Sequence, residues 1–284
     1  MKAIVSAEPL IGVSRTSNAH TRYYRSVFQN EDKVKILLAQ WQSLGLKTFL
    51  CPSHHQLLEI LGDSSRVMDV EIYPILLDAA QYSKAIQNYG MVGFARRQLT
   101  RIKIPHLPGI AYTGVRYLPK ILRRDFRYAS LLLASMEMAS FGRFPARVVF
   151  LHPQVTDLAL ANDNGEFFRL FARFVRSRYK VEAGLMTNNI GVLLDRLDKW
   201  SLDITHVAGP VNRRGYHMKP DQSKCEELIA KTKRTVIATE LSFTAIPTED
   251  DLTYLNRLGV SSFVVELGDI MDALRLTDLL AKFP

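Results

Sequence analysis

The stretch "VEAGLMTNNIGVLLDRLDKWSLDITHVAG", residues 181–209, contains two apolar runs separated by an amphipathic segment. Residues 181–187 form a short apolar run that ends in polar side chains, which predicts a buried strand. Residues 189–200 have the periodicity of an amphipathic helix, and residues 204–209 form a second apolar run. This succession predicts two parallel strands joined by a helix.

The same alternation runs through most of the chain. It predicts eight strands, at 9–14, 47–51, 70–76, 147–152, 181–187, 204–209, 235–241 and 261–267. It predicts helices at 31–44, 54–61, 79–99, 165–178, 189–200, 221–232, 248–258 and 270–282. Eight strands with helices between them predict an α/β protein with a (β/α)8 (TIM) barrel in one domain, residues 1–284. A doubly wound open sheet is the structural alternative, but no GxGxxG follows the first predicted strand.

One segment interrupts the even spacing. Residues 101–146, between the third and fourth predicted strands, are longer than a barrel connection requires, and we expect them to form a helical insertion. Residues 91–147 contain eleven basic and two acidic residues, so this segment accounts for the whole net charge of +9.

The basic segment is open to three interpretations. An apolar run with Leu131, Leu132, Leu133, Met136 and Met138 follows an arginine cluster, as in helices that lie on anionic membranes. The segment could instead be a lid that closes over a substrate, or a helical hairpin packed on the barrel. No nucleic-acid-reading module is recognisable, so we expect no nucleic-acid partner.

Cysteine usage and hydropathy restrict the location of the protein. The two cysteines, Cys51 and Cys225, have no CxxC or Cys/His spacing, so we expect neither a disulfide framework nor structural zinc. The apolar N-terminus is interrupted by Glu8, so we expect no signal peptide. No run approaches the eighteen apolar residues that a membrane-spanning helix needs. We therefore expect a cytoplasmic protein, with association with a membrane surface as an open alternative; the oligomeric state is not predicted.

Polar side chains stand where the predicted strands end, which is where TIM barrels carry their chemistry. His152 follows the fourth strand, and Glu240 and Glu266 end the seventh and eighth; these three are the predicted catalytic residues. The predicted substrate- or cofactor-binding residues are Arg15, Asp78, Asn188, Asn212, Arg213, Arg214 and Tyr216. "SHH" at 53–55 suggests a metal pair, but adjacent helical residues point in different directions, and we predict no metal ligands there.

The segment 148–267 resembles the second half of an aldo-keto reductase. "VVFLHPQ" (148–154) is similar to that family's fourth strand, and "VEAGLMTNNIGVLLDRL" (181–197) to its fifth strand and following helix. "ITHVAGPVNRRGY", "TVIATELSFTAIP" and "GVSSFVVELGDIMDALRLTDLL" resemble its sixth, seventh and eighth strands. The resemblance implies a TIM barrel, an NADP or NAD cofactor, and a role for His152 in polarising a substrate carbonyl. The family's tyrosine, lysine and aspartate are not at their expected places, and its basic phosphate-binding signature is absent from the eighth strand.

Two functions in addition to reduction remain open. Glu240 and Glu266 could serve a non-redox lyase or isomerase, with or without a divalent metal, or could form salt bridges with Arg213, Arg214 or Arg15. His152 could also only cap a strand end. Arg213 and Arg214 suggest an anionic substrate, so the leading prediction is an enzyme for a small carbonyl- or hydroxyl-bearing, anionic metabolite. The alternative outside enzymes is a catalytically silent barrel that binds a partner or a membrane.

Overall fold

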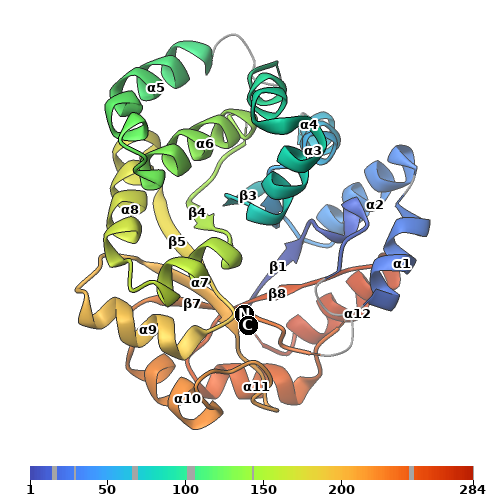
Figure 1. The fold of residues 1–284 in the computed structure, drawn as a ribbon. Coiled ribbons are helices and arrows are strands. Elements are labelled where there is room, and N and C mark those ends of the chain that lie inside the picture. The colour runs from blue at the N-terminus through green and yellow to red at the C-terminus, as the bar shows by residue number, and fades with distance from the viewer. Residues whose placement is uncertain are drawn as a thin grey trace.

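Eight parallel strands close into a barrel in this computed structural model, which describes residues 1–14, 18–28, 30–65, 70–100, 106–142, 144–242 and 246–283 (Figure 1). The strands are β1 (Lys2–Ser6), β2 (Thr48–Pro52), β3 (Glu71–Leu76), β4 (Val148–Leu151), β5 (Glu182–Met186), β6 (His206–Pro210), β7 (Thr235–Thr239) and β8 (Ser262–Val265). The first and last strands, β1 and β8, pair with each other and close the barrel. Their register runs from the pair Lys2 and Ser262 to the pair Val5 and Val265. The predicted (β/α)8 barrel is thereby confirmed, and the open sheet is excluded.

Helices surround the barrel. They are α1 (Asn18–Val27), α2 (Glu31–Ser43), α3 (His55–Ser65), α4 (Ala79–Thr100), α5 (Leu107–Leu122), α6 (Phe126–Ser140), α7 (Pro153–Ala161), α8 (Gly165–Tyr179), α9 (Ile190–Lys199), α10 (Gln222–Lys231), α11 (Glu249–Arg257) and α12 (Ile270–Leu280). In the described residues no helix is both long enough and apolar enough to cross a bilayer.

The predicted first strand at 9–14 is wrong. The strand is Lys2–Ser6, and Pro9–Ile11 form a short 3-10 helix. Pro9 occupies the first turn of that helix, and Gly12 ends it in the left-handed region with φ 70°. An apolar run broken by proline and glycine therefore makes a turn, and the polar residues at the end of β1 are Ser6 and Glu8.

The barrel interior is filled by side chains that alternate along the strands. They form a separate apolar cluster of Ile4, Leu50, Tyr73, Ile75, Val148, Phe150, Met186, Ala208 and Ile237. Gly184 on β5 faces the Phe150 ring, and a Cβ at this glycine would lie 2.5 Å from the ring. At the N-terminal end, Lys2 donates to Glu71 at 2.8 Å and to the Tyr73 hydroxyl at 3.1 Å. The interior is a packed core, so a ligand must bind beyond the strand ends.

Three helices occupy the long connection between β3 and β4. α6 packs on β3 and α8 and contributes Leu131, Ala134 and Met138 to the core between strands and helices. It therefore takes the position of a barrel helix, although its sequence lies in the segment 101–146 that we expected to be an insertion. α5 packs on α6 and lies farther from the strands (Figure 1). Residues 101–105 lie outside the described residues.

Candidate functional site

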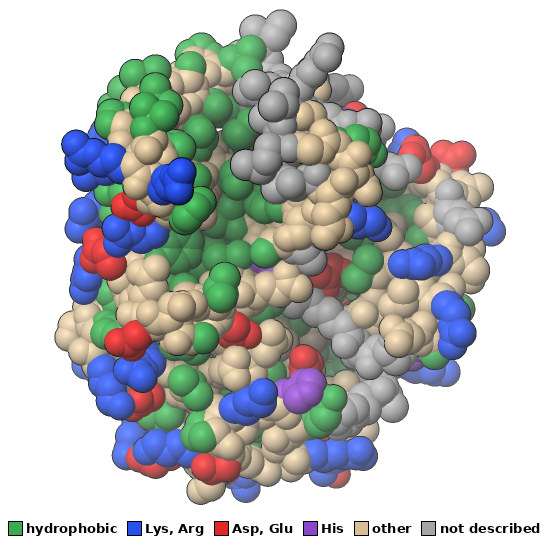
Figure 2. All heavy atoms as spheres, in the orientation of Figure 1, with side chains coloured by type: hydrophobic (Ala, Val, Ile, Leu, Met, Phe, Trp, Pro, Cys, Tyr) green, Lys and Arg blue, Asp and Glu red, His purple; other side chains and the backbone are tan. Residues whose placement is uncertain are grey.

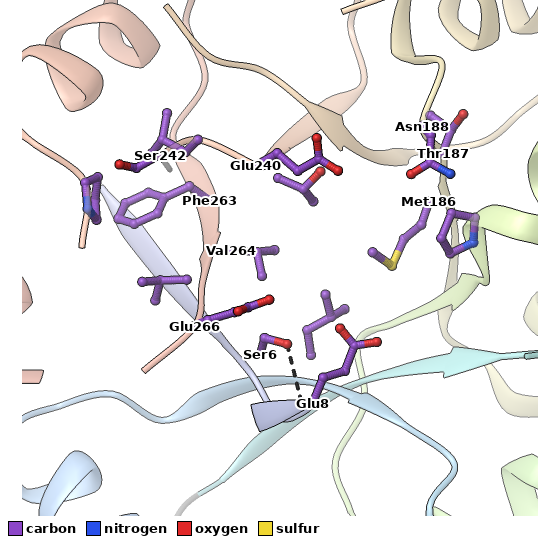
Figure 3. A pocket seen from close by; sticks show the side chains of 16 residues that line it. Ser6, Glu8, Met186, Thr187, Asn188, Glu240, Ser242, Phe263, Val264 and Glu266 are labelled. Carbon is purple, nitrogen blue, oxygen red and sulfur yellow. Dashed lines mark hydrogen bonds between the residues drawn. The ribbon is translucent and has the colours of Figure 1, made fainter. Parts of the chain in front are cut away.

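A pocket opens at the C-terminal ends of the strands (Figure 3). Met186 of the apolar cluster inside the barrel, Val264 packed against that cluster, and Phe263 line it. The remaining lining residues are Ser6, Glu8, Leu50, Pro153, Thr187, Asn188, Thr239, Glu240, Leu241, Ser242, Pro247, Val265 and Glu266. This is the face on which TIM barrels carry their active sites.

Three glutamates come to the pocket from three consecutive strands. Glu240 directly follows β7, Glu266 directly follows β8, and Glu8 lies two residues after β1. β8 pairs with both β7 and β1, so the three side chains come from adjacent positions around the barrel. In Figure 3 they surround one space. One part of the pocket wall is therefore acidic.

Glu240 is paired with a histidine from the neighbouring loop. His217 lies between β6 and α10, and its Nδ1 is 2.8 Å from Oε2 of Glu240. Both residues have left-handed backbones, with φ of 56° and 51°. The Tyr216 ring stacks on the imidazole with centroids 3.8 Å apart. This contact places an imidazole next to a carboxylate that lines the pocket.

Glu266 accepts a hydrogen bond from the Ser14 hydroxyl at 2.5 Å. Burial, and then the Glu266 carboxylate, raises the pKa of the Tyr24 phenol behind it. In the same way burial, and then Glu8, raises the pKa of the Cys51 thiol. Cys51 therefore remains a neutral thiol at physiological pH and is a poor nucleophile.

The pocket wall that follows β5 is polar but carries uncharged side chains in place of glutamates. Thr187 and Asn188 follow β5, and both are held by Asp157 of α7. The Thr187 hydroxyl donates to Oδ1 of Asp157, and the Asn188 amide nitrogen donates to Oδ2 at 2.8 Å. The Asn188 carboxamide is thus fixed in orientation at the pocket, as a group that orients a ligand must be.

His152, predicted as catalytic, caps α7. Its Nδ1 accepts from the backbone N–H of Gln154 at 3.3 Å, and its own backbone N–H donates to Leu76 at 2.9 Å. The side chain is buried, and Pro153 rather than His152 lines the pocket. The structure thus shows the capping contact, and a catalytic role for His152 stays a prediction.

The loop that follows β6 holds four of the predicted binding residues. Asn212 is buried and bonds to its own loop, donating from Nδ2 to Tyr216 O at 2.8 Å. It accepts at Oδ1 from the backbone N–H groups of Arg214 and Tyr216. Arg213 pairs with Asp251 and Asp250 of α11, each at 2.9 Å, and not with the glutamates. Hydrogen bonds within the loop therefore hold its conformation. None of the four predicted binding residues in this loop lines the pocket.

Asp78, predicted as a binding residue, and His55, from the suggested metal pair, do not line the pocket. Asp78 caps α4, accepting from the Gln81 N–H at 3.0 Å. His55 pairs with Glu59 one turn along α3, at 3.2 Å and in an exposed position. Arg15 lies outside the described residues. Of the nine predicted site residues that the structure describes, Glu240, Glu266 and Asn188 line the pocket.

Glu8 and His217 were missed by the sequence reasoning. Glu8 was missed because the first strand was placed seven residues too late. His217 lies in "NRRGYHMKP" (212–220), where the two arginines drew the prediction. The sequence did contain a signal for this pair. His217 follows the sixth strand and Glu240 ends the seventh, so neighbouring strands bring an imidazole and a carboxylate to the same end of the barrel.

The chemistry of the lining residues bears on the expected cofactors. A nicotinamide dinucleotide carries an anionic pyrophosphate, which basic side chains or a glycine-rich helix N-terminus usually bind. The lining residues that the structure describes include three glutamates and no lysine, arginine or tyrosine, so this described lining does not fit the pyrophosphate, and the nicotinamide cofactor stays a prediction. In the described ranges, no three His, Cys, Asp or Glu side chains are grouped so that they could hold a metal ion.

Comparison with known proteins adds no family to this description. No model of a known protein family matches the chain, and no curated protein matches it in sequence. Fold and site together define a (β/α)8 barrel with an acidic pocket at its C-terminal face. The fold implied by the aldo-keto reductase resemblance is confirmed, while the activity it implies stays a prediction.

Proposed function

We propose that the protein is an enzyme that moves protons on a small neutral or cationic substrate bearing hydroxyl or carbonyl groups. One observation carries the proposal: Glu240, Glu266 and Glu8 come from three consecutive strands and line a single pocket where barrels carry chemistry. Barrels of this fold are commonly enzymes.

The carboxylates suit general acid–base catalysis. A glutamate hydrogen-bonded to a histidine forms a pair in which a proton can be shared and passed on. The His217–Glu240 contact supplies such a pair, and Glu266 supplies a second carboxylate from the next strand. Two acid–base groups on adjacent strands fit an isomerisation or lyase reaction, in which one group removes a proton and another returns one.

The charge of the pocket argues against an anionic substrate. Three carboxylates in a partly enclosed space attract a cation and repel an anion. We expected Arg213 and Arg214 to bind anionic groups, and the guanidinium of Arg213 is engaged by Asp250 and Asp251. We therefore replace the anionic metabolite of the sequence prediction with a neutral or cationic one.

Hydroxyl recognition is supported by the β5 wall. Thr187 and Asn188 are both oriented by Asp157, so this part of the pocket presents fixed polar groups opposite the acidic wall. A polyhydroxylated ligand would find hydrogen-bonding partners on both sides, with Phe263 and Met186 available for its carbon faces.

Three ligands with one carbon skeleton and different charges test the proposal. Glucamine is cationic, sorbitol is neutral and gluconate is anionic, and calorimetric titration of each gives its Kd. We expect glucamine to bind most tightly and gluconate most weakly. Glu266→Gln should weaken glucamine by roughly 5- to 30-fold, the loss of one charged contact of about 1–2 kcal/mol.

A matched control isolates the pocket charge. Glu59→Gln removes an equal charge from the exposed surface of α3 and should leave all three affinities unchanged. Tightest binding of gluconate, or equal effects of the two substitutions, would overturn the proposal.

A further inference from the structure

The outer surface of α5 is apolar and exposed. Val115 is 73% exposed, Leu122 74% and Leu118 50%. Tyr112 and Leu107 on the same helix, and Phe126 at the start of α6, are also exposed. Six of the fourteen large hydrophobic side chains exposed in the described residues thus lie within one stretch of 20 residues. We call these six side chains the α5 ridge.

The exposed residues form a continuous arc. At 3.6 residues per turn, Leu107, Leu118, Leu122, Val115 and Tyr112 project within about 140° of the helix circumference. In Figure 2 this part of the surface appears as a group of hydrophobic side chains at the upper left, over α5. A contiguous apolar surface of this kind marks an interaction site more often than isolated exposed side chains do.

The ridge is not the face by which α5 packs on the protein. Ile110 and Thr113 are buried on another side of the helix. Tyr117 packs edge-on against Tyr128 of α6, with centroids 5.2 Å apart. Arg178 of α8 donates to Gly109 O at 2.6 Å. Because α5 already has a buried face, its apolar ridge is additional to what the fold requires.

Basic side chains border the ridge. Arg116, Lys120, Arg123 and Arg124 are exposed, and residues 107–124 contain no acidic residue. The nearby Asp125 is neutralised within its own turn by Arg127, which it contacts at 2.8 Å. The result is an apolar strip with four cations beside it, which matches the composition of a helix that lies at an anionic lipid surface.

We infer that α5 is a docking surface for the anionic surface of a lipid bilayer. The ridge enters the boundary between headgroups and acyl chains, and the four cations contact lipid phosphates. The charge complementarity selects this occupant, since a second copy of the chain would bring the same four cations against one another. Among the open interpretations, the run 131–138 was the possible membrane contact, but Leu131 and Met138 are buried in the core and the exposed apolar face belongs to α5.

Vesicle co-sedimentation tests the inference. Vesicles of phosphatidylcholine alone are compared with vesicles of equal parts phosphatidylcholine and phosphatidylglycerol, at low and high salt. We expect binding to the mixed vesicles that salt weakens. Each of Arg116→Gln and Arg123→Gln should lower partitioning about fivefold, and Val115→Asp with Leu122→Asp should abolish it.

The matched control is Ile36→Asp, which places a charge at a 60% exposed apolar position on α2, away from the ridge. It should leave vesicle binding unchanged, and circular dichroism confirms that each variant is folded. Failure to bind mixed vesicles, or binding that Val115→Asp with Leu122→Asp leaves intact, would overturn the inference. So would a dimer in gel filtration that the same double substitution dissociates, because the ridge would then cover a second copy.

Discussion

Glu137 of α6 makes stability depend on pH in a predictable direction. The side chain is buried, and its carboxyl accepts from the Leu77 N–H at 2.7 Å, from the Ser53 hydroxyl at 2.9 Å and from the Tyr82 hydroxyl. Burial raises the pKa of Glu137 to about 7, and the three hydrogen bonds oppose the shift. The group thus joins α6 to the ends of β2 and β3 and to α4.

The direction of this pH dependence follows from the pKa of Glu137 in the unfolded and in the folded state. The unfolded carboxyl ionises near its ordinary pKa of 4.5, and the folded one near 7. The folded state therefore holds the proton more tightly, and the stability gained from it is complete below pH 4.5 and is lost as pH rises towards 7. At 1.4 kcal/mol per pKa unit, the loss is about 3 kcal/mol.

Urea denaturation, followed by circular dichroism from about pH 4 to about pH 8, measures this loss. Glu137→Gln removes the titration, so the difference in unfolding free energy between wild type and variant should change by about 3 kcal/mol over that range. Tyr82→Phe removes a hydrogen bond that lowers the pKa of Glu137, so the loss should extend to higher pH. Unfolding free energies of wild type and Glu137→Gln that run parallel across this pH range would show that Glu137 does not titrate as described.

Three further substitutions separate structural residues from ligand contacts. Arg213→Ala should leave the Kd for glucamine unchanged in calorimetry, because Arg213 pairs with Asp251; a tenfold weakening would contradict the site described above. Asn212→Ala removes three hydrogen bonds from a buried side chain and should cost about 2–4 kcal/mol in urea denaturation, whereas a cost below about 1 kcal/mol would contradict the bracing role. Gly184→Ala places a methyl group 2.5 Å from the Phe150 ring and should lower stability by about 1–3 kcal/mol or more, and an unchanged Tm would show that the interior is not packed as described.

The fold was largely predictable from the sequence. Seven strands were placed within one or two residues, because buried parallel strands read as apolar runs ending in polar residues. The first strand, β1, was misplaced for a local reason. "PLIGVS" (9–14) is as apolar as a strand, yet Pro9 and Gly12 impose a turn. The helix α7 was also missed, since its nine residues follow β4 almost without a loop.

The site was predictable only in part. Glu240 and Glu266 were found because a charged residue that directly ends an apolar strand must face the barrel mouth or a partner. Glu8 was lost with the misplaced strand. The partners of Arg213 could not be read from the sequence, because Asp250 and Asp251 lie 37 and 38 residues away and only the fold brings them together.

The most direct test of the acidic pocket is a crystal structure of the protein with glucamine. We expect the ligand to lie beyond the C-terminal ends of the strands, with its amine within hydrogen-bond distance of Glu240 or Glu266 and a hydroxyl near Asn188. Glucamine bound elsewhere, with the three glutamates turned away from the pocket, would contradict it.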